Sequence, residues 1–167
     1  DGSVAWVKSD AAYEDGEPDG TGIGLVWTGT QLYAVFTVDG GDGDLAQDFR
    51  RNAQDADTSW LKSYGSGGGA KASVIGQIDL ATGTLGRTAF LTSIKSDGKT
   101  NSLLVTDVTV NDAGNLVVTA DSFFTPRQAN GQPFETQITS AGSPFVYTVE
   151  LTPDLKKVVS TFAEGWV

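Results

Sequence analysis

The sequence predicts an all-β fold, in which two four-stranded antiparallel units pack as a sandwich or an incomplete propeller and one short helix lies in a long loop. Short runs rich in β-branched and aromatic residues alternate between apolar and polar side chains, which is typical of half-buried antiparallel strands. Glycine, with 21 residues, and frequent Thr, Ser and Asp separate these runs as turns. With 167 residues, 39% of them hydrophobic, the chain is expected to form a single domain over residues 1–167.

The predicted strands form two units, preceded by an extra N-terminal strand within residues 1–9 whose apolar run covers 4–9. The first blade-like unit, residues 22–93, has its strands at 22–27, 32–39, 73–80 and 85–93. The second blade-like unit, residues 103–164, has its strands at 103–110, 115–123, 145–151 and 157–164. Gly, Asn, Asp and Pro supply the φ values that tight turns need, which predicts hairpin turns at 28–31, 81–84, 111–114 and 152–154.

Two connections, 40–72 and 125–144, are too long for hairpin turns. The first is expected to hold the helix. Asp44 is a suitable N-cap, because Gln47 follows it three residues later, and Leu45 and Phe49 fall on one helical face.

The two units are similar to each other and resemble a known repeat. The stretch Asn-Asp-Ala-Gly-Asn at 111–115, followed by Leu-Val-Val-Thr, resembles the SBBP-type bacterial β-propeller repeat, and the hairpins at 75–85 and 146–155 are similar to a second part of it. The resemblance implies four-stranded blades of an extracellular or cell-surface bacterial protein. Propellers close with about 4 to 8 blades, so two units imply a fragment, a ring shared by several chains, or two sheets packed face to face, which hides both apolar faces in one chain.

The composition excludes several classes of function. With no His and no Cys, the chain cannot form Ser-His-Asp or Cys-His nucleophilic sites, zinc sites with imidazole or thiolate ligands, or disulfides. A formal net charge of −10 repels phosphate backbones and anionic membrane surfaces, so we expect no nucleic-acid partner. No apolar run reaches the roughly 18 residues of a membrane span, so we expect no membrane insertion. Because Met is absent even at position 1, we expect a processed N-terminus, as after removal of a signal peptide.

An acidic stretch in the first long connection is a candidate calcium site. Oxygen ligands at alternate positions with glycine between them can surround a hard cation. The alternative is a solvated acidic turn joined to a helix N-cap. The candidate ligands are Asp39, Asp42, Asp44 and Asp48.

Aromatic residues are candidates for sugar binding. Trp6, Trp27 and Trp166 lie in or beside apolar runs, where burial is expected. Trp60, with Tyr64 nearby, lies in the long polar loop and is expected to be the most exposed tryptophan, either as a ligand contact or as an anchor of that loop.

Carboxylates on or beside strands are candidates for a glycosidase pair, which needs two of them about 5 to 10 Å apart. We expect instead that these residues satisfy turn amides. The residues concerned are Asp79, Asp107, Asp121 and Glu150.

The N-terminal run is a candidate assembly strand, with Val4, Trp6 and Lys8 on one of its faces. Both units already have four strands, so this run either closes its own sheet beside residues 22–27 or adds to the open edge of a neighbouring copy.

These observations predict a non-enzymatic structural or adhesive module, extracellular or on a cell surface. Its partners would be copies of itself, by strand addition, or other surface components. The alternative function is a carbohydrate-binding, lectin-like module, assisted by calcium.

Overall fold

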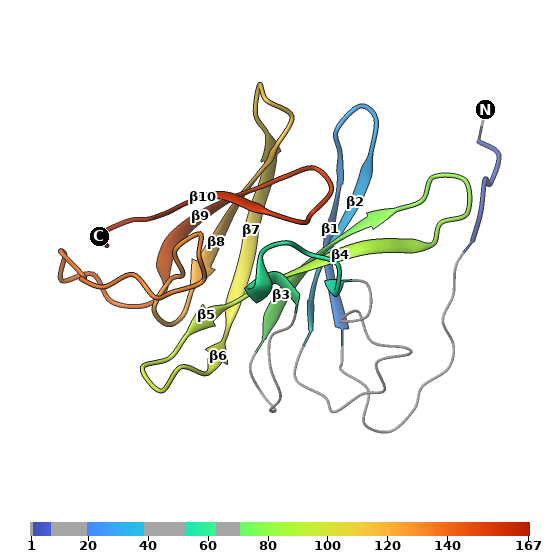
Figure 1. Ribbon diagram of the computed structural model, residues 1–167. Coiled ribbons are helices and arrows are strands. Elements are labelled where there is room, and N and C mark those ends of the chain that lie inside the picture. Colours follow the sequence, from blue (N-terminus) through green and yellow to red (C-terminus); the bar gives the residue numbers. More distant parts are fainter. Residues whose placement is uncertain (1, 8–19, 39–52, 63–70) are drawn as a thin grey trace.

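The computed structural model describes residues 2–7, 20–38, 53–62 and 71–167, which form an all-β fold with two four-stranded antiparallel sheets (Figure 1). The first sheet contains β1 (Gly20–Trp27), β2 (Leu32–Val38), β3 (Ala72–Ile78) and β4 (Leu85–Leu91) in sequential order. The second contains β7 (Leu103–Val110), β8 (Leu116–Ser122), β9 (Phe145–Leu151) and β10 (Val158–Ala163), also in sequential order. The predicted fold class is thus confirmed, and the described strands close no barrel.

A small two-stranded sheet between the two units was not predicted. It pairs β5 (Ser93–Ile94) with β6 (Thr100–Asn101). The turn between them bonds the Lys95 N–H to the Lys99 carbonyl and the Gly98 N–H to the Lys95 carbonyl. Two-residue strands leave no periodicity to detect, which is why the sequence shows only a polar connection here.

The hairpin turns form where the sequence places them. In the β7–β8 turn the Asn111 carboxamide oxygen accepts the N–H groups of Ala113 and Asn115, while Gly114 takes a φ of 81° that suits glycine. The β9–β10 turn differs, because its left-handed residue is Leu155, with a φ of 59° and a fully buried side chain. Burial in the core holds this conformation against its steric cost.

The larger of two hydrophobic clusters combines buried residues of both four-stranded sheets. Residues of β2, β8 and β9 alternate between buried and more exposed positions, as half-buried strands require. The first sheet contributes Tyr33, Val35, Ile75, Ala89 and Leu91, and the second contributes Leu103, Val105, Leu116, Val118, Ala120, Tyr147, Val149 and Leu151.

A buried serine joins the two sheets within this core. The Ser73 hydroxyl of β3 donates a hydrogen bond to the Leu103 carbonyl and accepts one from the Val105 N–H, both at 2.9 Å. The Leu103 N–H also donates to the Lys71 carbonyl at 3.0 Å. The start of β7 therefore bonds to the first sheet through backbone groups that β8 does not use.

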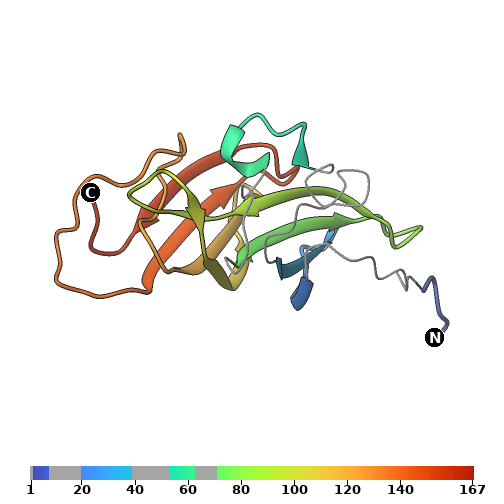
Figure 2. The ribbon, with the colours of Figure 1, turned by 90° about the horizontal axis from the view of Figure 1, so that it is seen from below.

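Residues 53–62 cover one side of the core and contain a 3-10 helix, Ser59–Lys62, as Figure 2 shows. This is the short helix of the long connection, and its Trp60 and Leu61 are buried. The helix predicted at residues 44–49 lies outside the described residues.

The predicted N-terminal strand is not formed in the described residues 2–7, which corrects our expectation for this segment. The Trp6 indole N–H donates to the Leu80 carbonyl at 2.9 Å, and the ring covers Gly83 so closely that an added Cβ would collide with it. Because the indole finds this partner on the β3–β4 turn, the segment lies beside that turn and not beside β1 (Figure 1). Lys8 lies outside the described residues.

Candidate functional site

The strongest candidate site is a groove between the edge strands of the two sheets, which we call the edge groove. The strand order leaves β1 at one edge of the first sheet and β7 at one edge of the second, and Figure 1 shows these strands beside each other. The groove has a volume of about 390 Å³. Its walls are residues 23–27 of β1, Val35 of β2 and residues 105–108 of β7.

The β1 edge of the groove presents backbone groups that bond to no strand among the described residues. The Thr28 N–H donates to the Gln31 carbonyl at 3.1 Å, which fixes the hydrogen-bonding alternation of the hairpin. In an antiparallel ladder every second residue then points its N–H and C=O away from its partner strand. Leu25 and Trp27 are in this position, facing away from β2.

The outward backbone groups of β7 are hydrogen-bonded at the start of the strand, and those further along the strand have no partner strand among the described residues. The Asn111 N–H donates to the Asn115 carbonyl at 3.0 Å, so Val108 and Val110 direct their backbone groups away from β8. The earlier outward groups, at Leu103 and Val105, already bond to Lys71 and Ser73. The edge groove is therefore open beyond Val105.

A β-bulge lies in each wall of the edge groove. The ladder shifts between Gly22 and Gly24 in β1, and between Val105 and Asp107 in β7, so that Ile23 and Thr106 are the inserted residues. Bulges are frequent at sheet edges and beside binding sites, where they bend the strand and redirect side chains. The two bulges therefore confine the regular, unpaired strand edges to the part of β1 after Ile23 and the part of β7 after Thr106.

Large apolar side chains of β1 remain accessible beside the groove. The exposed fractions are 43% for Ile23, 71% for Leu25 and 56% for Trp27. The expectation that Trp27 is buried is therefore wrong, because β1 has a neighbouring strand on one side only. The sequence signal that could have identified this edge is the position of β1 as the first strand of a sequential meander.

The charge of the edge groove is acidic. Asp107 is the only charged residue among the described residues that line it, and the whole chain carries a formal net charge of −10. A partner with a positive charge beside apolar side chains is therefore favoured over an acidic one.

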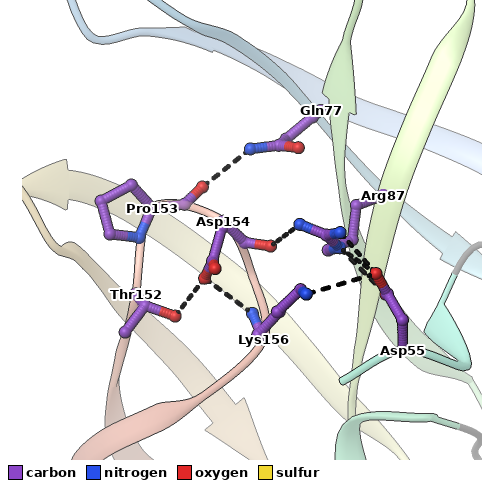
Figure 3. Close-up of polar contacts among 7 residues, drawn as sticks. All are labelled: Asp55, Gln77, Arg87, Thr152, Pro153, Asp154 and Lys156. Atoms are coloured by element: carbon purple, nitrogen blue, oxygen red, sulfur yellow. Dashed lines mark hydrogen bonds and ion pairs between the residues drawn. The ribbon is translucent and has the colours of Figure 1, made fainter. Parts of the chain in front are cut away.

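A polar cluster on the β9–β10 turn joins the second sheet to the first and to residues 53–62 (Figure 3). Arg87 of β4 donates its Nε to both carboxylate oxygens of Asp55, at 2.9 and 3.1 Å, and its Nη2 forms a further short bond to Asp55. Lys156 Nζ lies 3.6 Å from the same carboxylate. The hydrogen bond from Arg87 lowers the pKa of Asp55.

The turn carbonyls complete this cluster. The Pro153 carbonyl accepts the Tyr33 hydroxyl at 2.7 Å. It also accepts the Gln77 amide at 2.9 Å, and the Asp154 carbonyl accepts Arg87 Nη1 at 3.1 Å (Figure 3). Every one of these donors belongs to the first sheet. The Arg87 guanidinium and the Asp55 carboxylate already form an ion pair with each other. The cluster therefore connects the two sheets and leaves neither of these charges free to bind a ligand.

Trp60 is buried, which reverses the exposure that we expected. Its exposed fraction is 8%, its indole N–H donates to the Ala129 carbonyl at 3.2 Å, and the Arg127 guanidinium lies 5.7 Å from the ring centroid. Gly131 packs so closely that an added Cβ would be 2.7 Å from Trp60 Cδ1. These contacts agree with the interpretation of Trp60 as an anchor, because residues of the second long connection cover the ring. Tyr64 lies outside the described residues.

The predicted calcium ligands Asp39, Asp42, Asp44 and Asp48 also lie outside the described residues. Within the described ranges no group of three or more carboxylates is placed to hold a metal ion. The calcium site therefore stays a prediction.

Two of the carboxylates considered for glycoside hydrolysis are engaged in turns. Asp79 accepts the N–H groups of Ala81 and Thr82, both at 2.9 Å. Glu150 accepts hydrogen bonds from Asn115, Ser160 and Asn111, which lower its pKa. A general acid requires the opposite shift.

Comparison with family models, with curated proteins and with solved structures found no match. In the part of the chain that the structure describes, no helix has the length and apolar character needed to cross a membrane.

Proposed function

We propose that the protein is a non-enzymatic structural module of an extracellular or cell-surface assembly, which associates with copies of itself through the edge groove. The observation that carries the proposal is the open β1 edge, where outward backbone groups at Leu25 and Trp27 coincide with exposed apolar side chains. Edge strands of this kind pair readily with another chain unless they are covered or charged. β1 carries no charged residue.

The remaining features support a structural role. The resemblance of each unit to a propeller blade fits two four-stranded sheets in sequential order. The absence of His and Cys removes the commonest catalytic groups, and the lowered pKa of Glu150 disfavours acid catalysis. A localisation outside the cell rests on the resemblance and on the acidic composition.

The test is the mass of the protein in solution as a function of concentration, measured by light scattering. We expect the mean mass to rise with concentration, and Leu25→Lys to reduce this association because a charge on an edge strand opposes pairing. Phe162→Lys is the matched control, since Phe162 is 63% exposed on β10, outside the edge groove. A full-length chain that stays monomeric at every concentration would overturn the proposal.

A second function, carbohydrate binding, is favoured by one observation. Trp27 is exposed in the edge groove, beside Thr106 and Asp107, and an exposed indole near polar groups can stack on a sugar ring. A glycan array decides this alternative. Saturable binding that Trp27→Ala removes would support it, and no binding to any glycan would exclude it.

A further inference from the structure

We infer that the edge groove accepts the N-terminal segment of a second copy, residues 4–8, as an added β-strand beside β1. This inference rests on the proposed function and names the partner of the same groove. Strand addition combines main-chain hydrogen bonds with pockets for alternate side chains. The structure supplies an acceptor edge and a donor segment in the same chain.

The described part of the donor segment, residues 4–7, is exposed and forms no strand in its own chain. Val4 is 75% exposed and Val7 is 78% exposed, and the described residues 2–7 pair with no strand. Its alternation of Val4 and Trp6 with Ala5 and Val7 gives two apolar faces. A segment with apolar residues on both faces is suited to a position between two sheets and not to an exposed edge.

The acceptor provides matching contacts on both faces of such a strand. A strand added beside β1 would place alternate side chains next to Leu25 and Trp27 on one face, and next to Val26 and Val105 in the groove on the other. The open backbone groups of Leu25 and Trp27 lie within the span of a strand of about five residues. The added strand would thus cover the exposed part of β1.

Charge favours the same pairing. The segment 4–8 carries one charged side chain, Lys8, and the residues that line the groove include one, Asp107. The two signs are opposite. This pair would act locally, against the general repulsion between copies of a chain with a net charge of −10.

The position of the segment makes the contact heterologous. Trp6 holds residues 2–7 at the β3–β4 turn, through Leu80 and Gly83, and both views show this end of the molecule away from β7 (Figures 1 and 2). Donor and acceptor are different surfaces, so each copy can donate to one neighbour and accept from another. Such a contact generates a ring or a filament.

The experiment uses a labelled synthetic peptide of residues 1–10 and the chain lacking residues 1–9, with binding measured by fluorescence anisotropy. We expect saturable binding. Leu25→Pro should weaken it about tenfold or more, because proline removes an outward N–H that makes no bond to β2. Leu25→Ala keeps this N–H and should weaken binding less, and Phe162→Ala, on β10, should leave it unchanged.

A charge exchange tests the inference independently of proline. Asp107→Lys should weaken binding of the native peptide, and a peptide with Lys8→Glu should recover binding to this variant. Absent binding, or binding that neither Leu25→Pro nor Asp107→Lys changes, overturns the inference.

Assembly of the two proteins separates this inference from the proposed function. We expect the full-length chain to assemble and the chain lacking residues 1–9 to stay monomeric. If the shortened chain still assembles and Leu25→Lys still prevents it, the edge groove is an interface but its occupant is not the N-terminal segment. If the full-length chain is monomeric although the peptide binds, the segment does not enter the groove of a neighbouring copy, and both proposals are wrong.

Discussion

Replacing Ser73 by alanine tests whether the two sheets depend on one another. The substitution leaves the Leu103 carbonyl and the Val105 N–H without the bonds, both 2.9 Å long, that the hydroxyl makes with them in the buried core. Each buried polar group that loses its partner costs about 1 to 3 kcal/mol. We therefore expect the free energy of unfolding to fall by about 3 kcal/mol. With an m-value of about 2 kcal/mol/M, the urea midpoint falls by about 1.5 M.

The assay is equilibrium unfolding in urea, followed by circular dichroism and tryptophan fluorescence together, so that a separation of the two transitions is visible. Ser143→Ala is the matched control, because the Ser143 hydroxyl also donates to a carbonyl, that of Phe123, but at an exposed position. Its expected cost is within about 0.5 kcal/mol. A Ser73→Ala protein that loses no more stability than this control would refute the view that Ser73 couples the sheets.

Three further predictions concern other parts of the chain. Gly131→Ala should lower the melting temperature, because Gly131 has a φ of 87° and the added Cβ would meet Trp60. Gly142→Ala is the control: its Cβ would meet no atom within 4 Å, so the melting temperature should not change. Hydrogen bonds from Asn115, Ser160 and Asn111 lower the pKa of Glu150 below the ordinary value of a glutamate, so its contribution to stability is present above that ordinary value and is lost as the pH falls through the lowered folded value. Glu150→Gln should therefore lose less stability between pH 6 and pH 3 than the native protein, and equal losses would contradict this. Millimolar calcium should raise the melting temperature relative to chelator, and an unchanged value would remove the predicted site at Asp39, Asp42, Asp44 and Asp48.

The strands were predictable because their signals are local. Alternating side chains and turn residues lie within a few positions of one another, so β7 at Leu103–Val110 and β9 at Phe145–Leu151 begin and end at the predicted residues. The turn at Gly114 was predictable for the same reason. What these signals do not contain is which strand lies at the edge of a sheet.

The candidate site was much less predictable, because it depends on neighbours that are distant in the sequence. Trp27 and Trp60 show this most clearly. Trp27 lies in an apolar run yet is exposed, because no strand follows β1 outward. Trp60 lies in a polar loop yet is buried, because Ala129 and Gly131 cover it from about 70 positions further along the chain. The edge groove itself exists only when two sheets meet.

The left-handed turn at Leu155 has a consequence for how the chain folds. An isolated hairpin has little reason to hold a leucine at a φ of 59°, a conformation that costs an L-residue about 1 to 2 kcal/mol. In the folded protein this cost is offset by burial of the Leu155 side chain and by the bonds that Tyr33, Gln77 and Arg87 make to the neighbouring carbonyls. The last hairpin should therefore reach its native shape more readily against an already formed first sheet than in isolation. The two repeats are therefore not interchangeable modules that fold one by one, and fragments separated between them should regain native structure only when they are mixed.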